Sequence, residues 1–210
     1  MKNNKGILVV LSGFSGSGKG TIMKELVRKY DYALSISATT RNPREGEENG
    51  REYYFLSREK FEEMIGKDGF IEYAEYVGNY YGTPKEYVNN QLESGHNVLL
   101  EIEMQGGMLV KEQFPDAVLL FVTPPSAQIL YDRLVGRGTE DMETVKKRLT
   151  RASEEAKYMK DYDYIIINDI LDETVDNVHN VIETEHFRTH RQADLMNRMT
   201  EELDTLQKGF

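Results

Sequence analysis

Several residue types are missing or scarce in this 210-residue chain. It contains no cysteine and no tryptophan. The absence of cysteine excludes disulfide bonds, thiolate metal sites and a cysteine nucleophile, and it is typical of proteins of the reducing cytoplasm. The apolar run at residues 7–11 is too short for the core of a signal peptide, and no run approaches membrane-spanning length. We therefore expect a cytoplasmic protein without a membrane partner.

Basic residues are outnumbered: 26 Lys and Arg stand against 36 Asp and Glu, giving a formal net charge of -10. Binding a nucleic-acid duplex needs a basic face, so we expect no nucleic-acid partner. The arginines nevertheless gather in two segments, which are Arg41, Arg44 and Arg51, and Arg133, Arg137, Arg148 and Arg151. Such clusters in an acidic chain favour small phosphorylated ligands. The alternative is that they are surface arginines paired with Glu45, Glu47 and Glu140.

A glycine-rich run follows the apolar residues 7–11 and is the most informative stretch. It consists of Gly13, Phe14, Ser15, Gly16, Ser17, Gly18, Lys19, Gly20 and Thr21. Its glycines let backbone N–H groups turn inward as a nest for phosphate oxygens, and Lys19 adds a charge for the β- and γ-phosphates. Apolar spacing after Thr21 predicts a helix, whose N-terminus favours anions. The order of strand, loop and helix predicts a phosphate-binding P-loop.

The magnesium ligands are less well specified by the pattern. Gly20 stands where the usual P-loop has Ser or Thr. The hydroxyl for Mg2+ then comes from Thr21 or Ser17, or the ion keeps mostly water ligands. Residues 97–103 predict a buried parallel strand that ends in Glu101 and Glu103, and the carboxyl ends of such strands face the ligand. We expect one of these acids to order Mg2+-bound water; the alternative is that both are exposed strand-end carboxylates.

Strand-like and helical segments alternate along the chain, which predicts an α/β fold with a parallel sheet. Within it, Asn49-Gly50 predicts a hairpin with 53–55 as the returning strand, 70–77 a strand, and 78–83 a further turn. Residues 164–167 predict a last buried strand. The glycines around Arg137 predict a lid that folds over phosphates.

The C-terminal residues carry an apolar seam at 3-4-3 spacing, formed by Met196, Met199, Leu203 and Leu206. This spacing predicts a helix with one apolar stripe. The stripe either packs back on the parent domain or pairs with another copy to give a homo-oligomer, and the sequence leaves both open.

Taken together, these motifs resemble the guanylate kinase family, whose members transfer the γ-phosphoryl group of ATP to GMP. The resemblance rests on residues 13–21, 37–47, 49–53, 70–72, 78–83, 100–106, 124–126, 136–139 and 167–169. It implies a P-loop nucleoside monophosphate kinase fold with a parallel sheet core. A guanylate kinase-like domain would span 5–188, with a GMP-binding insertion at about 37–97 and a short lid at about 136–150. Residues 189–210 would form a helical tail.

The resemblance also implies roles for individual residues. GMP-binding positions are Ser37, Arg41, Arg44, Tyr53, Glu72, Tyr81, Thr83 and Glu103. ATP-binding positions are residues 13–21, Arg133, Arg137 and Asn168. Catalytic positions are Lys19, Arg41, Arg44, Arg137 and Arg148, and Mg2+ would be held by Thr21 and Glu101, partly through water.

Two other interpretations compete with this one. A catalytically inactive guanylate-kinase-like module would bind partner proteins, but such modules generally lack an intact nucleotide loop. A P-loop kinase for another small phosphorylated acceptor would leave Glu72 and Glu103 without a role.

Overall fold

Five parallel strands form the core sheet of the computed structural model, which describes residues 5–136 and 141–209. Their order is β2-β7-β1-β8-β9, and every neighbouring pair is parallel. The strands are β1 (Leu8–Gly13), β2 (Ala33–Leu34), β7 (Val98–Glu101), β8 (Val118–Thr123) and β9 (Tyr164–Ile167). Long aliphatic runs such as that of β8 suit a sheet that is covered on both faces.

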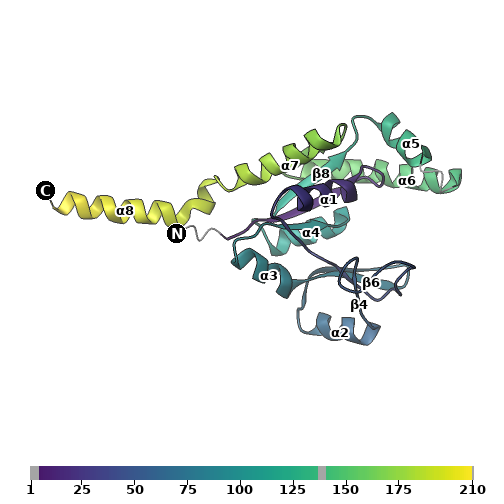
Figure 1. Ribbon diagram of the computed structural model, residues 1–210, viewed down its shortest axis with the longest axis horizontal. Helices are drawn as coiled ribbons and strands as arrows, with labels where there is room; N and C mark the ends of the chain where they lie inside the picture. The colour runs from purple at the N-terminus through teal and green to yellow at the C-terminus, as the bar shows by residue number, and fades with distance from the viewer. Residues whose placement is uncertain (1–4, 137–140, 210) are drawn as a thin grey trace.

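Helices cover both faces of this sheet (Figure 1). Residues of α1 (Lys19–Lys29) and α7 (Leu171–Glu185) pack against one face, where Val118, Leu120 and Val122 also point. Leu119 and Phe121 point to the opposite face. That face is covered by α3 (Lys85–Glu93), α4 (Met104–Gln113), α5 (Ala127–Gly136) and α6 (Met142–Glu155).

A second, four-stranded sheet forms a separate lobe, which carries α2 on its outer side (Figure 1). Its strand order is β4-β3-β6-β5. The elements are β3 (Ala38–Thr39), β4 (Tyr54–Phe55), α2 (Arg58–Gly66), β5 (Phe70–Tyr76) and β6 (Asn79–Pro84). The small core under this sheet contains Ala38, Phe61 and Phe70.

Two turn predictions in this lobe are wrong. Gly50 does lie in a turn, with φ of 83°, but β4 then pairs parallel with β3 instead of returning antiparallel. Residues 79–84 are the strand β6, which pairs antiparallel with β5. The turn is shorter than predicted because Val77 and Gly78, with φ of 48° and 74°, reverse the chain by themselves. Gly78 therefore directly precedes the strand β6 and does not begin a longer turn.

The ends of the core sheet also differ from expectation. β9 is an edge strand, and Ile165 and Ile167 are 45% and 58% exposed, so the prediction of a buried strand is wrong. After the short 3-10 turns at Ala156–Asp161 and Thr189–Gln192, α8 (Ala193–Lys208) extends away from the body (Figure 1). None of its residues is buried, so its apolar stripe does not pack on the parent domain. Within the described residues, no helix is long and apolar enough to cross a membrane.

Candidate active site

The loop between β1 and α1 is shaped by glycines that tolerate no side chain. A Cβ atom at Gly13, where φ is 147°, would lie 2.1 Å from the carbonyl oxygen of Val122. At Gly18, where φ is 92°, it would lie 2.4 Å from Nδ2 of Asn168. Both positions combine a left-handed backbone with a close neighbour. The loop therefore packs directly against the ends of β8 and β9.

Basic and amide side chains gather around this loop. Lys19 Nζ donates to the carbonyl oxygens of Gly13 at 2.8 Å and Phe14 at 3.2 Å, so the lysine lies across the loop. Arg148 of α6 donates to Ser15 Oγ at 2.9 Å. The buried Asn168 side chain donates to the Ser17 carbonyl at 2.7 Å, and Arg133 donates to the Asn168 carbonyl at 2.9 Å. The predicted lid at about 136–150 is described only in part: Arg137 and the rest of 137–140 lie outside the described residues, and the lid residues from Met142 onward belong to α6.

Glu101, at the end of β7, faces the first turn of α1. Its Oε2 atom lies 3.5 Å from the point where a side chain at position 20 would place its Cβ. The removal of water from around its carboxylate raises the pKa of Glu101, whereas the charges of Lys19 and Lys24 act to lower that pKa. Thr21 is exposed on the same turn. A carboxylate and a hydroxyl are oxygen ligands that suit Mg2+, and the described residues contain no larger His, Cys, Asp or Glu cluster for a metal.

Arg41 and Arg44, which are predicted to bind the acceptor phosphate, lie in the loop after β3. The Arg41 guanidinium makes a bidentate pair with Glu47, at 2.9 and 3.0 Å, and lies 5.4 Å from the centre of the Tyr53 ring. Tyr81 packs edge-on against Tyr53. Hydrogen bonding to Arg41 lowers the pKa of Glu47, which also accepts from the Arg44 backbone N–H at 2.7 Å. Glu47 thus fixes both the side chain of Arg41 and the backbone at Arg44.

The remaining residues predicted to bind the acceptor phosphate are more open. The Arg44 side chain is exposed, and Ser37 is half-buried at the start of β3. Burial raises the pKa of the Tyr53 hydroxyl, and the neighbouring Tyr81 adds to the shift, whereas the charge of Arg41 opposes it.

Two carboxylates flank the start of α4. Glu72 of β5 is only 8% exposed, and Oγ1 of Thr83 donates to its Oε1 atom at 2.7 Å. Burial raises the pKa of Glu72, and the hydrogen bonds from Thr83 partly oppose that shift. A Cβ atom at Gly106, in the first turn of α4, would lie 3.2 Å from Glu72 Oε2. Glu103 is the N-cap residue of the same helix, so Glu72 and Glu103 both lie near the first turn of α4.

Comparison with known proteins shows the family of the chain. The family model described as guanylate kinase matches residues 5–185. The chain belongs to the guanylate kinase family. It is 48% identical to the guanylate kinase of Latilactobacillus sakei over 199 residues, which cover 94% of this chain and 98% of the relative. It is 51% identical to that of Streptococcus thermophilus over 191 residues, covering 90% and 91%.

A solved guanylate kinase has the same fold. The crystal structure of guanylate kinase from Anaplasma phagocytophilum superposes with a TM-score of 0.73 at 33% sequence identity. The match covers 91% of this chain and 92% of that one. The α/β fold with a parallel sheet core, predicted from the sequence, is therefore confirmed.

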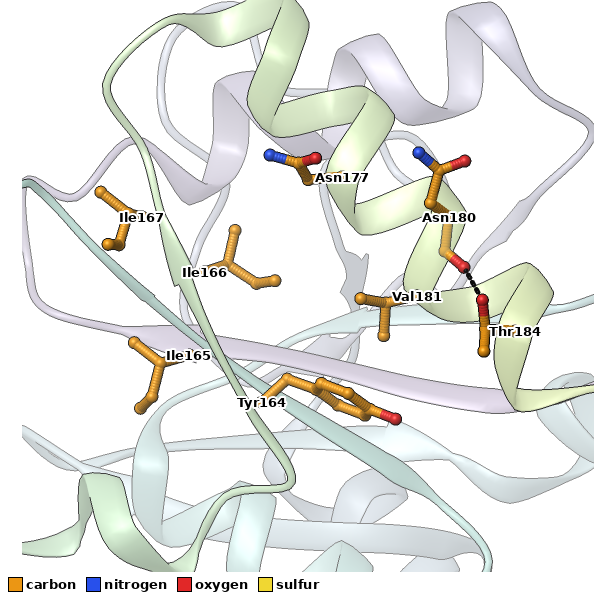
Figure 2. Close-up of a pocket in the computed structure, with 8 residues that line it drawn as sticks. All are labelled: Tyr164, Ile165, Ile166, Ile167, Asn177, Asn180, Val181 and Thr184. Carbon is orange, nitrogen blue, oxygen red and sulfur yellow. Dashed lines mark hydrogen bonds between the residues drawn. The ribbon is translucent and has the colours of Figure 1, made fainter.

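Pockets of this guanylate kinase family member also lie away from the P-loop. One of about 470 Å³ runs between the open edge of β9 and the flank of α7 (Figure 2). It is lined by residues 164–167, Asn177, Asn180, Val181 and Thr184, none of which was predicted to bind nucleotide. A second pocket, of about 330 Å³, lies between the lobe and α4 and has Glu72 in its wall.

Two residues of the site were not recognised as functional from the sequence. The sequence indicates Glu47 only as a surface partner for arginine. Both Glu47 and Arg41 lie in an irregular loop, so no helical or strand spacing predicts that they pair. Arg151 was grouped with the phosphate-binding arginines. It instead donates to Glu103 Oε2 at 2.5 Å. Its position three residues after Arg148 places both on one face of α6, a signal that helical spacing does contain.

Proposed function

We propose that this protein transfers the γ-phosphoryl group of ATP to GMP and releases ADP and GDP. The observation that carries the proposal is the convergence of a lysine-bearing P-loop, an arginine and tyrosine anion site, and two carboxylates at the start of α4. The P-loop alone serves many reactions. The carboxylates select the acceptor, because guanine presents adjacent N–H donors on one edge and adenine does not.

On the donor side, the amides of residues 13–21 and the charge of Lys19 hold the ATP phosphates. Arg133 and Arg137 neutralise charge there, and Asn168 contacts the adenine side. Asn168 already connects the loop to β9 through its bond to Ser17, so one residue both shapes the loop and lines the donor site. These roles follow the family resemblance and agree with the contacts around the loop.

Mg2+ would be held by Glu101 and Thr21, partly through water. When bound there, it would supply positive charge to the group in transfer. The protein offers few ligands at this place, so phosphate oxygens and water would complete the coordination, as is common for Mg2+. ATP and GMP are then the small-molecule partners of the enzyme.

On the acceptor side, Ser37, Arg41, Arg44, Tyr53 and Tyr81 hold the GMP phosphate. A guanidinium has five N–H donors, so Arg41 can keep its bidentate pair with Glu47 and still donate to a phosphate. That pair holds the fork in one orientation before the ligand arrives, which reduces the ordering cost of binding.

Glu72 and Glu103 accept the N1–H and N2–H donors of guanine, and Thr83 holds Glu72 in place. The base of AMP presents no such pair of N–H donors, so acceptor positions of the buried Glu72 carboxylate would stay unfilled. The cost of an unpaired buried acceptor supports a GMP preference on the order of 10⁴-fold at best.

Transfer needs no covalent enzyme intermediate. An oxygen of the GMP phosphate attacks the γ-phosphorus while the bond to the ADP oxygen breaks. Arg41 and Arg44 aim the acceptor, and Lys19, Arg137 and Arg148 spread the charge of the group in transfer. Arg148 is already placed at the P-loop by its bond to Ser15. Closure of the lobe and lid over the two nucleotides would exclude water, which otherwise competes as acceptor.

A coupled ADP-release assay with Mg2+-ATP tests this function, using GMP, dGMP, AMP and UMP as separate acceptors. We expect fast turnover with GMP and little with AMP. Turnover without a guanine preference would refute the acceptor site. Binding of GMP without turnover would identify a protein-binding module instead of an enzyme.

We further propose that two copies pair through α8 in the cytoplasm. The exposed stripe would be covered in an antiparallel pair centred at residue 201, in which Met196 meets Leu206 and Met199 meets Leu203. The same register places opposite charges level with each other, Asp194 with Lys208 and Arg198 with Asp204. Light scattering after size exclusion should show a dimer for the full chain and a monomer for Leu203→Asp; a wild-type monomer would refute the pairing.

A further inference from the structure

Arg151 of α6 stands in a row of alternating charges between Glu103 and Glu155. Arg151 Nη2 donates to Glu103 Oε2 at 2.5 Å, and Arg151 Nε donates to Glu155 Oε1 at 2.9 Å. The Glu155 side chain is only 13% exposed. Its pKa is raised by burial, and the charges of Arg151 and Lys19 oppose that shift. The row therefore runs from Glu103 through Arg151 to the carboxylate of Glu155.

The helix that carries Arg151 is firmly placed. Val145 and Ala152 of α6 are buried in the core beneath the sheet. Arg148 lies one turn before Arg151 and donates to Ser15 in the P-loop. One face of α6 therefore contacts the phosphate loop with one arginine and the acceptor side with the next.

Glu103 itself has little else to fix its side chain. The side chain is 69% exposed, and Glu103 makes no side-chain hydrogen bond as the N-cap of α4. A free glutamate samples many rotamers, and ordering it upon binding costs free energy. A carboxylate has about four acceptor positions, so one N–H from Arg151 on Oε2 leaves the other positions open to a base.

We propose that Arg151 is a positioning residue for acceptor recognition, which holds the Glu103 carboxylate in place for the base of the incoming nucleotide. The inference rests on the proposed function, because it takes Glu103 as a reader of guanine. The sequence predicts a different role for Arg151, which is to bind phosphate together with the neighbouring arginines. Glu155 supports the role by holding the other edge of the Arg151 guanidinium.

Steady-state kinetics of Arg151→Ala test the proposal. An exposed pair of this kind has a modest effect, so we expect KM for GMP to rise about fivefold. The values of kcat and of KM for ATP should stay within about twofold of wild type. Turnover of AMP should not change, so the GMP-over-AMP preference should fall by about the same factor. Arg28→Ala removes an exposed arginine pair on α1 and serves as the matched control.

A double-mutant cycle separates positioning from a general structural effect. In a Glu103→Ala background, which lacks the acceptor for Arg151, the added Arg151→Ala change should have no further effect on KM for GMP. Arg151→Lys should recover part of the loss, because it restores a donor without the fork. An unchanged fivefold effect in the Glu103→Ala background, an equal loss with AMP, or a rise in KM for ATP would each overturn the proposal. Absence of wild-type turnover with GMP would instead refute the proposed function.

Discussion

Replacing Gly20 by serine would test the geometry between the P-loop and the acid at the end of β7. Gly20 is the second residue of α1, and its backbone has no left-handed dihedral. A Cβ atom at this position meets Glu101 Oε2 at 3.5 Å and Oε1 at 3.8 Å, which are ordinary contact distances. The structure therefore has room for a side chain, and a serine hydroxyl would lie within reach of the carboxylate.

The magnitude follows from two contributions. In a helix, serine is favoured over glycine by about 0.5 kcal/mol and alanine by about 1 kcal/mol. A hydrogen bond to an ionised group adds about 1.5 kcal/mol, at the lower end of the usual range. Gly20→Ser should then stabilise the protein by about 2 kcal/mol and Gly20→Ala by about 1 kcal/mol. For a chain of this size, these values correspond to Tm increases of about 4–8 °C and about 2–4 °C.

Thermal unfolding of the nucleotide-free protein, followed by circular dichroism, measures this order. We expect Tm to rise from wild type to Gly20→Ala and again to Gly20→Ser. If alanine were more stabilising than serine, the hydroxyl would not reach Glu101. If both variants melted below wild type, the space beside Glu101 would not exist, and the proposed arrangement of the Mg2+ edge would be wrong.

Three further variants probe the nucleotide sites. Lys19→Ala should reduce transfer at least about 100-fold while titration shows GMP binding largely intact; equal loss of both would mean that the donor role is wrong. Glu72→Gln should raise Tm at pH 7 but not near pH 4. Burial raises the pKa of Glu72 in the folded protein, so the ionised carboxylate destabilises the fold once the pH rises above the pKa that Glu72 has in the unfolded chain. Equal changes in Tm at both pH values would contradict this. Gly18→Ala should destabilise by about 1–3 kcal/mol, because of φ 92° and the Asn168 contact; an unchanged denaturant midpoint would refute the close packing there.

The local parts of the site were the most predictable from sequence. The P-loop needs a strand, a glycine-rich turn and a helix in immediate succession, and all three signals lie within a short stretch. The strand β7 was predicted from its apolar run followed by acids, although it ends at Glu101 and not at position 103. Features of this kind depend on neighbouring residues only, so tertiary structure did not change them.

Features that depend on distant partners could not be predicted. The direction of β4 is set by its pairing with β3 and not by the turn at Gly50. β9 has the apolar composition of a buried strand but lies at the edge of the sheet. Its own sequence does not indicate that it pairs with a strand on one side only. The pairing of Arg151 with Glu103 joins residues 48 positions apart, and an arginine that binds a carboxylate has the same local sequence as one that binds phosphate.

The division of the molecule into two sheets has a consequence for how an acceptor is sensed. Arg41 and Tyr81 belong to the lobe, as do Glu72 and Thr83, whereas Glu103 follows a strand of the core sheet. An isolated phosphate ion would contact residues of the lobe alone and would not draw the lobe toward the core sheet. A nucleotide whose base reaches both Glu72 and Glu103 ties the two bodies together. If Glu72 and Glu103 contact guanine as proposed, GMP would therefore join the lobe to the core sheet before any phosphoryl group has moved.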